Sequence, residues 1–285
     1  MEIYLIYSQI MELDLRLDGT TYSVALNPLD ISIPLIFNGP QPNTYGVPQA
    51  VSEAFEGGGF VGDVRRGGSC NFETYQFTPH CNGTHTECIG HIAEARIPVH
   101  SSLGPSFIPS TLITVNPTPA EASRDSYDPP LAPQDMVIDV ASLQEALPNG
   151  HPEFLEALVI RTTPNDPSKR SRDYMKTPPP FFSWEAMKLI RSWNVTHLLV
   201  DMPSVDRLFD EGKLSIHHIF WGVPQGSNNV SESDGIDRTI TEMIYVADDI
   251  EDGRYLLDLQ IAPFVSDAAP SRPRLFRLTE RVDQG

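Results

Sequence analysis

Residues 79–91, with the sequence PHCNGTHTECIGH, bring three of the chain's eight histidines together with two cysteines and a glutamate. Imidazole nitrogen, thiolate sulfur and carboxylate oxygen are the ligands that Zn²⁺ prefers, and a hydrolytic zinc site keeps one position open for water. A site with four protein ligands, or one with two ions, also needs donors from elsewhere in the chain. The fold must therefore carry distant residues to this one segment.

Within this segment, His80, His85 and Glu87 are close enough in sequence to surround one ion. Glu87 follows His85 by two residues, so in an extended backbone both side chains point to the same side. Gly83, between the two histidines, would allow a tight backbone path that turns both imidazoles inward. A single histidine is usually structural, and the prediction of a metal site therefore rests on the clustering.

Other kinds of site find less support in the sequence. Cys81 and Cys88 are seven residues apart and form no Cys-x-x-Cys pair, which argues against a zinc finger. The chain has no Gly-x-Ser-x-Gly nucleophile motif. The glycine-rich residues 56–69 lack the Gly-Lys-Ser/Thr ending of a phosphate-binding loop. We expect them to form a flexible surface loop, and a mobile lid is one role that such a loop can have.

His217 and His218 are the second notable group of histidines. On a helix, adjacent side chains point about 100° apart, so only one of the two can reach a given ion. The alternative is that the pair is a surface feature without a ligand role.

Hydrophobic patterning predicts strands interleaved with a few helices. Alternating residues on both sides of Asp18-Gly19 predict a β-hairpin, and Ser183 is a good N-cap for a helix. Further strands are expected over 71–79, 135–140, 156–163, 196–206, 241–250, 254–264 and 273–282, and helices around 141–147, 184–194 and 207–221. This order predicts an α/β protein with a mixed sheet. No repeat or sharp change in composition divides the chain, so one domain is expected over residues 1–285.

The charge balance excludes some classes of partner. The formal net charge is −18, which argues against binding of nucleic acid and of an anionic membrane surface, and a small-molecule substrate fits better. Three cysteines do not make a disulfide framework and suit a reducing compartment. Residues 1–10 are apolar but lack the basic start of a signal peptide. A cytoplasmic location is therefore expected.

Three separate motifs, in the same order along the chain, resemble those of the cyclase family of metal-dependent hydrolases, best known from bacterial kynurenine formamidases. GTHTECIGH at 83–91 is similar to the family signature His-x-Gly-Thr-His-x-Asp-x-Pro-x-His, with glutamate in place of the aspartate. DMPSVD at 201–206 followed by the His-His pair resembles a later family segment, and DISIPLIFNGPQP at 30–42 resembles an early one. The resemblance spans about residues 28 to 280.

The resemblance implies a swivelling β/β/α fold and assigns roles to individual residues. The first histidine of the signature falls on Cys81, so either Cys81 is a ligand or a bulge at the strand end brings in His80, which we favour. The implied metal ligands are His80, His85, Glu87, His217 and Glu242, of which the last three would hold a second ion. His91 and Glu242 would be catalytic, with His91 as the general acid/base. Phe37 would cover a flat substrate, and a core phenylalanine is the alternative.

The implied activity is metal-dependent cleavage of a C–N bond in a small amide, formamide or cyclic amide, similar to an arylformamidase. The expected cofactor is a divalent metal, with Zn²⁺ first, Mn²⁺ second, and one or two ions. Alternatives are hydrolysis of a lactone or another cyclic ester at the same site, and a catalytically silent relative that binds metal or ligand. A homodimer or homotetramer is implied, because relatives often complete the rim of the pocket from a neighbouring subunit.

Overall fold

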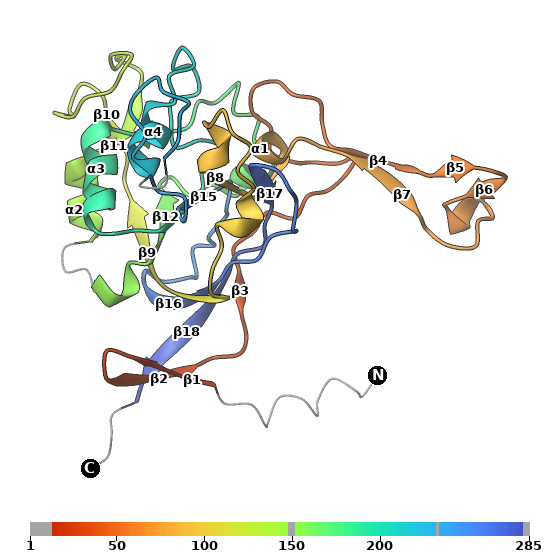
Figure 1. Cartoon of the computed structure of the whole chain (residues 1–285), viewed down its shortest axis with the longest axis horizontal. Coiled ribbons are helices and arrows are strands. Elements are labelled where there is room, and N and C mark those ends of the chain that lie inside the picture. The colour runs from red at the N-terminus through yellow and green to blue at the C-terminus, as the bar shows by residue number, and fades with distance from the viewer. Residues whose placement is uncertain (1–12, 148–151, 232–233, 282–285) are drawn as a thin grey trace.

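A mixed β-sheet forms the body of the protein in the computed structural model, which describes residues 13–147, 152–231 and 234–281 (Figure 1). Within the described residues this sheet has eleven strands, with β3 (Leu29–Asp30) paired to β18 beside the main path. The spatial order of the other strands is β1 (Leu13–Leu17), β2 (Thr20–Val24), β18 (Arg274–Glu280), β16 (Gly253–Asp258), β9 (Phe107–Val115), β12 (Ala157–Thr162), β14 (His197–Val200), β15 (Thr239–Glu242), β8 (His85–Cys88) and β17 (Ala268–Pro270). The hairpin predicted around Asp18-Gly19 is β1–β2.

The centre of the sheet is parallel and its flanks are antiparallel. Strands β9, β12, β14 and β15 pair in parallel, while β8 joins β15 in antiparallel fashion and β16 does the same on the other side. All six residues of β12, ALVIRT, are buried, as expected for a central strand covered on both faces. The predicted α/β class with a mixed sheet and few helices is confirmed.

Three helices cover one face of this sheet (Figure 1). They are α2 (Val140–Ala146), α3 (Trp184–Ser192) and α4 (Ser215–Trp221). The Ser183 hydroxyl accepts a hydrogen bond from the Ala186 N–H, so the predicted N-cap of α3 is confirmed. Apolar residues of α3 and α4 pack on Leu158, Ile160 and neighbouring strand residues in one buried cluster. The intervening residue, Val159, belongs to a second cluster that includes residues of β16 and β18.

Shorter elements complete the described part of the chain. The fourth α-helix there, α1 (Pro79–Asn82), is a single turn. A small sheet contains β10 (Thr118–Pro119), β11 (Met136–Ile138) and β13 (Phe181–Phe182). The described residues also form short 3₁₀ helices, which are η1 (Val64–Arg66), η2 (Ile89–His91), η3 (Val99–Ser101), η4 (Pro152–Phe154) and η5 (Pro167–Ser171). In the described ranges no helix has the length and apolar character of a membrane span. Residues 1–10, which we expected not to be a signal peptide, lie outside the described residues.

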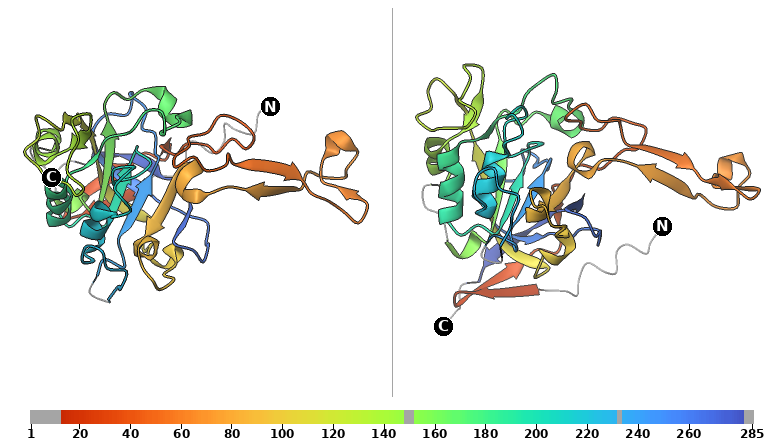
Figure 2. Two further views of the ribbon diagram at one scale, coloured as in Figure 1. Left: turned by 90° about the horizontal axis from the view of Figure 1, so that it is seen from above. Right: turned by 45° about the horizontal axis from the view of Figure 1, so that its top comes forward.

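A long arm projects from the body and is clear in all three views (Figures 1 and 2). It is a two-stranded ribbon of β4 (Val51–Ala54) and β7 (Glu73–Gln76), and its tip carries β5 (Glu56–Gly57), β6 (Phe60–Val61) and η1. The glycine-rich residues 56–69 therefore carry two short strands and a 3₁₀ turn at the tip of the arm, and their flexibility stays a prediction. The tip points away from the body, so the structure does not support a lid over a site there.

The turn after β14 is held by a buried ion pair. Asp201, at the start of this turn, accepts hydrogen bonds from the backbone N–H and the hydroxyl of Thr162. The Lys169 ammonium lies 2.8 Å from an Asp201 carboxylate oxygen and also donates to the Thr162 carbonyl. Both charged side chains are buried, so removing one of them leaves the other uncompensated.

Replacing the buried cation should destabilise the fold strongly. We expect Lys169→Met to lower the free energy of unfolding by about 3–5 kcal/mol, because Asp201 would stay buried without its partner. The matched control is Lys176→Met, whose ion pair with Asp173 is exposed and should leave stability nearly unchanged. Urea unfolding of both variants measures the difference, and equal midpoints would contradict this role of the pair.

Candidate metal centre

Strand β8 supplies the first two side chains of a buried polar cluster. His85 and Glu87 alternate with Thr86, so both point to the same side of the sheet, as the sequence predicted. In the antiparallel pairing of β15 with β8, Glu242 stands opposite His85. The Glu242 carboxylate lies 3.4 Å from the Nε2 atom of His85 and also accepts a hydrogen bond from the Val205 N–H.

Helix α4 brings His217 to the same place. The Asp206 carboxylate accepts hydrogen bonds from the backbone N–H groups of Ile216 and His217, and so anchors the start of the helix. A further oxygen–nitrogen contact of 2.6 Å joins Asp206 to the Nδ1 atom of His217. The expectation that only one histidine of the pair reaches the cluster agrees with this geometry. His218 is also buried, and its Nδ1 atom has no hydrogen-bond partner.

His80 reaches the cluster from the one-turn helix α1, which stands where we had expected a strand end with a bulge. The bulge expectation is therefore wrong. A helical turn, and not a bulged strand, brings His80 to the cluster, and this turn aims His80 and Cys81 about 100° apart. Gly83 also departs from expectation. Its φ of 171° and ψ of −172° are extended backbone, which any residue adopts, so no left-handed conformation turns the imidazoles inward.

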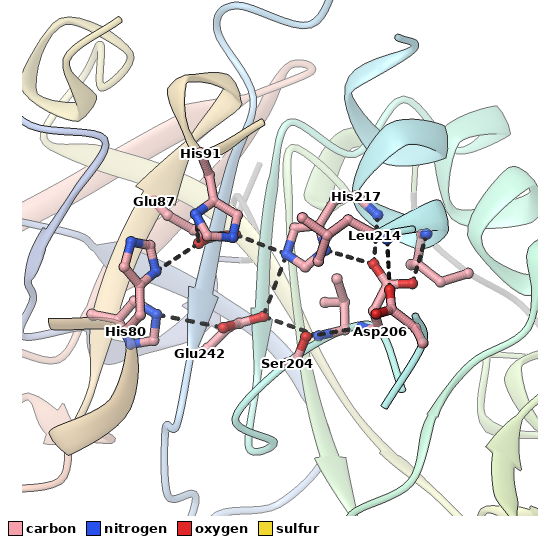
Figure 3. A network of polar contacts seen from close by, with 12 residues as sticks. His80, Glu87, His91, Ser204, Asp206, Leu214, His217 and Glu242 are labelled. Carbon is pink, nitrogen blue, oxygen red and sulfur yellow. Dashed lines mark hydrogen bonds and ion pairs between the residues drawn. The ribbon is translucent and has the colours of Figure 1, made fainter. Parts of the chain in front are cut away.

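Glu87 is the centre of the cluster (Figure 3). One carboxylate oxygen lies 3.1 Å from Nδ1 of His80 and 3.7 Å from Nδ1 of His91. The other oxygen lies 3.0 Å from Nε2 of His217. Glu87 thus contacts three imidazoles while its own side chain is almost completely buried.

The donor set fits a divalent cation. The Nδ1 atom of His85 lies 3.0 Å from the Gly83 carbonyl, to which it can donate. The Nε2 atom of His85 is buried, has no hydrogen-bond partner, and faces Glu242. Buried polar atoms are normally satisfied, so an unpartnered imidazole nitrogen beside a carboxylate is the arrangement of a metal ligand. Imidazole and carboxylate donors together suit Zn²⁺ and its neighbours among the transition metals.

Three overlapping groups of donor atoms lie within 4.8 Å of one another in the described part of the chain. They are His80, His85 and Glu87; Glu87, His91 and His217; and His80, His91 and Asp267. Of the predicted ligands, Glu242 is outside these tight groups and meets the cluster through His85 and, at 3.9 Å, through His217. Cys81 belongs to none of them.

Charges within the cluster shift the protonation of its members. Burial lowers the pKa of His80, but hydrogen bonds to Asp267 and Glu87 outweigh it and raise the pKa to about 10. Burial raises the pKa of Glu87, yet the charge of His91 and hydrogen bonds from His217 and His80 bring it well below its usual value. Without a metal ion the cluster therefore holds protons that a bound cation would displace.

The accessible side of the cluster is formed by three side chains. His85, Glu87, His217 and Glu242 are buried, whereas the side chains of His80, His91 and Asp267 are exposed by 26%, 26% and 38%. A pocket of about 370 Å³ opens beside His91 and Asp267. A small molecule can reach the cluster from this side.

Phe37 lies at the base of the arm. Its ring packs on Tyr75, with ring centroids 4.7 Å apart, and on Phe77 at 6.1 Å. This packing accounts for the side chain as a structural aromatic, and its role in substrate binding stays a prediction.

Sequence reasoning missed two residues near the cluster. Asp267 precedes β17, within a stretch that carries no motif, and contacts His80 and His91. Tyr45 has a φ of 55°, which is uncommon for a residue other than glycine, and burial together with the nearby charge of Glu242 raises the pKa of its hydroxyl. For Tyr45, the one signal in the sequence was Gly46 directly after it, which is typical of a turn.

The sequence matches a known family. Residues 27–207, more than half of the chain, match the family model named Cyclase and described as "Putative cyclase". No curated protein is similar enough to the sequence to count as a match.

Solved structures of low sequence identity share the fold. A "potential metal-dependent hydrolase with cyclase activity" is 16% identical with a TM-score of 0.57, and the match covers 89% of this chain and 100% of that one. Isatin hydrolase A from Labrenzia aggregata is 13% identical with a TM-score of 0.58, covering 88% and 93%. Isatin hydrolase A from Ralstonia solanacearum is 15% identical with a TM-score of 0.57, covering 88% and 91%. The cyclase-like fold expected from the motifs is confirmed.

The choice between His80 and Cys81 as a metal ligand can be tested directly. We expect His80→Ala to weaken zinc binding and Cys81→Ala to keep it, because His80 faces Glu87. Cys81 belongs to none of the tight donor groups, and burial and the charge of Glu242 raise the pKa of its thiol to about 11. Competition with a chromogenic chelator measures both affinities. Loss of zinc from Cys81→Ala alone would show that the thiol is the ligand.

Proposed function

Because this chain belongs to the cyclase family, we propose that it is a metal-dependent hydrolase that opens a C–N bond in a small amide, formamide or cyclic amide. The observation that carries the proposal is the convergence of buried imidazoles and carboxylates on Glu87, with His91 beside them at the accessible side. A purely structural cluster would not need a solvent-accessible, half-buried histidine close to a buried imidazole that lacks a hydrogen-bond partner.

The metal ligands that we propose are His80, His85, Glu87, His217 and Glu242, for one or two ions. Zinc is the first choice because imidazoles are numerous in the set, and manganese is the second. When bound, such an ion polarises a carbonyl group and lowers the pKa of water to near neutrality. These five donors lie on four elements, α1, β8, α4 and β15, which hold them in place before any substrate arrives.

His91 is the residue that we propose as general acid/base, with Glu242 as its catalytic partner deeper in the site. The leaving amine of a cleaved amide needs a proton, and imidazole titrates in the range where it can both take and give one. His91 is half-buried at the edge of the cluster, where its ring can meet the substrate. The ring lies 4.5 Å from that of His80, so proton transfer would occur close to the metal ligands.

The substrate class is proposed from the chemistry of the site and from the neighbours. Three of the structural neighbours are isatin hydrolases, which supports a cyclic amide, and an arylformamide is the related open-chain choice. A lactone or other cyclic ester is the alternative for the same site, and a silent metal-binding relative is the alternative without catalysis. We also propose a cytoplasmic location, since the three cysteines of the chain are free thiols.

Activity should depend on both the metal and His91. We expect metal-stripped protein to regain hydrolysis of N-formylkynurenine, isatin or a related amide when Zn²⁺ or Mn²⁺ is added. His91→Ala should lower kcat about 10²–10⁴-fold while metal content stays the same, because the proton donor is lost and the ligands remain. Steady-state kinetics with metal analysis measures both quantities.

The matched control is His100→Ala, an exposed histidine on η3 that contacts the Phe264 carbonyl and should leave kcat unchanged. Turnover of lactones but no amide would favour the alternative substrate class. Stoichiometric metal without turnover of any member of the panel would favour the silent relative.

We further propose that the protein forms a homodimer or homotetramer through the arm. A two-stranded ribbon is marginally stable alone in water, and β7 is exposed along its whole length. Large apolar side chains on the arm are also exposed, namely Phe55 (42%), Phe72 (54%) and Tyr75 (55%). Exposed apolar groups on one projecting segment are typical of a contact surface, and a second copy of the chain would cover them.

Shortening the arm should therefore lower the oligomeric state. We expect replacement of residues 55–72 by Asn-Gly, which joins β4 directly to β7, to shift the particle mass from two or four chains to one. Light scattering after size-exclusion chromatography measures the mass. The control is Phe209→Ser, which removes an equally exposed aromatic outside the arm. A monomeric wild type, or an unchanged mass in the shortened variant, would contradict the role of the arm.

A further inference from the structure

Asp267 stands beside the metal centre on the side opposite to Glu242. It immediately precedes β17, which pairs with β8, so its backbone lies next to the strand that carries Glu87. The Asp267 carbonyl accepts a hydrogen bond from the Cys88 N–H, and the Ser266 carbonyl accepts one from Val99. Two backbone hydrogen bonds thus fix the position of this carboxylate.

The side chain of Asp267 contacts two histidines with one oxygen. Its Oδ2 atom lies 2.9 Å from Nε2 of His80 and 3.3 Å from Nδ1 of His91. Gly90 allows this approach, because a Cβ atom there would lie 3.3 Å from the Cβ of Asp267 and 2.2 Å from the Ile97 carbonyl oxygen. The carboxylate is therefore built into the fold and does not sit on the surface by chance.

The two nitrogens of His80 face different groups. Nδ1 faces Glu87 and the centre of the cluster, at 3.1 Å, whereas Nε2 faces Asp267. A neutral imidazole has one N–H and one lone pair, and only the lone pair binds a metal. An ionised carboxylate only accepts hydrogen bonds, so Asp267 places the N–H on Nε2 and leaves the Nδ1 lone pair for the metal.

The same carboxylate contacts the other ring nitrogen in His91, with a different consequence for the role of that ring. There it faces Nδ1, so the N–H is held on Nδ1 and the lone pair is left on Nε2, which can then accept a proton. Asp206 is a comparison within this site, since it contacts Nδ1 of His217 while Nε2 faces Glu87. In His80 and His217 the outer carboxylate thus contacts the nitrogen that faces away from Glu87, whereas in His91 both Asp267 and Glu87 face Nδ1.

We propose that Asp267 is a positioning residue that sets the tautomers of His80 and His91 together, so that one is ready to bind metal and the other to accept a proton. The proposal rests on the proposed function for the roles of the two histidines. It does not require that a particular substrate be known. Because Asp267 contacts both the proposed ligand His80 and the proposed base His91, it would couple metal affinity to the tautomer of His91 that can accept a proton on Nε2.

The test uses the full-length zinc-loaded protein with ¹⁵N-labelled histidine. In the wild type we expect His91 to show an Nδ1–H ring and His80 an Nε2–H ring in long-range ¹H–¹⁵N spectra, with peaks assigned from His80→Gln and His91→Gln. In Asp267→Ala the His91 signal should move to the other tautomer. Zinc affinity should fall about 10–100-fold, as is usual when the carboxylate behind a ligating histidine is lost.

Two further variants separate positioning from folding. Asp267→Asn keeps the size of the side chain and should weaken zinc binding less than Asp267→Ala, because the amide oxygen still accepts but carries no charge. Glu121→Gln removes an exposed carboxylate elsewhere and should change neither spectrum nor affinity. Melting curves of all variants report whether the fold is kept.

The outcomes distinguish this proposal from that for the function. Unchanged His91 tautomer and unchanged zinc affinity in both Asp267 variants would overturn it. Loss of one ion from the stoichiometry in Asp267→Ala would overturn it as well, because Asp267 would then be a ligand. The expected spectral and affinity changes without turnover of any substrate would support the role of Asp267 and overturn the proposed hydrolase.

Discussion

The site depends on one buried carboxylate that meets three imidazoles at once. Glu87 is 1% exposed, and a carboxylate removed from water to this degree is stable only with compensating charge or hydrogen bonds. His80, His91 and His217 supply that compensation from α1, η2 and α4. The helices α1, η2 and α4 must therefore hold fixed positions relative to β8. This requirement ties these local helices to the central sheet.

The order of strands explains how so many donors meet at one strand. β8 lies between β15 and β17, so one neighbour delivers Glu242 and the loop before the other delivers Asp267. Outside the strands, the anchored turn 201–206 contributes Asp206 to hold His217. The site thus lies where antiparallel strands join the parallel centre, and sheet pairing brings Glu242 and Asp267 to β8 while helices bring His80 and His217.

Sequence reasoning predicted those parts of the site that follow from local periodicity. The two-residue spacing of His85 and Glu87 placed both on one face of a strand, and helical geometry allowed only one histidine of the 217–218 pair to reach them. His80 was favoured for a wrong reason, since a helical turn and not a bulge brings it inward. No local pattern marks Asp267, because its position depends on the pairing of β17 with β8. These strands are far apart in the sequence, and local periodicity carries no information about such pairings.

Glutamate in place of the family's aspartate has a geometric consequence in this cluster. The longer side chain carries the carboxylate of Glu87 further from the backbone of β8, where one oxygen faces His217 and the other faces His80 and His91. An aspartate on the same backbone would sit one methylene further from the rings and could not keep contacts of about 3 Å to both sides without moving β8. The extra reach also brings Glu87 within range of His91 on the accessible side. With glutamate at this position, one carboxylate joins the buried imidazole of His217 to the half-buried His91, the base that we propose.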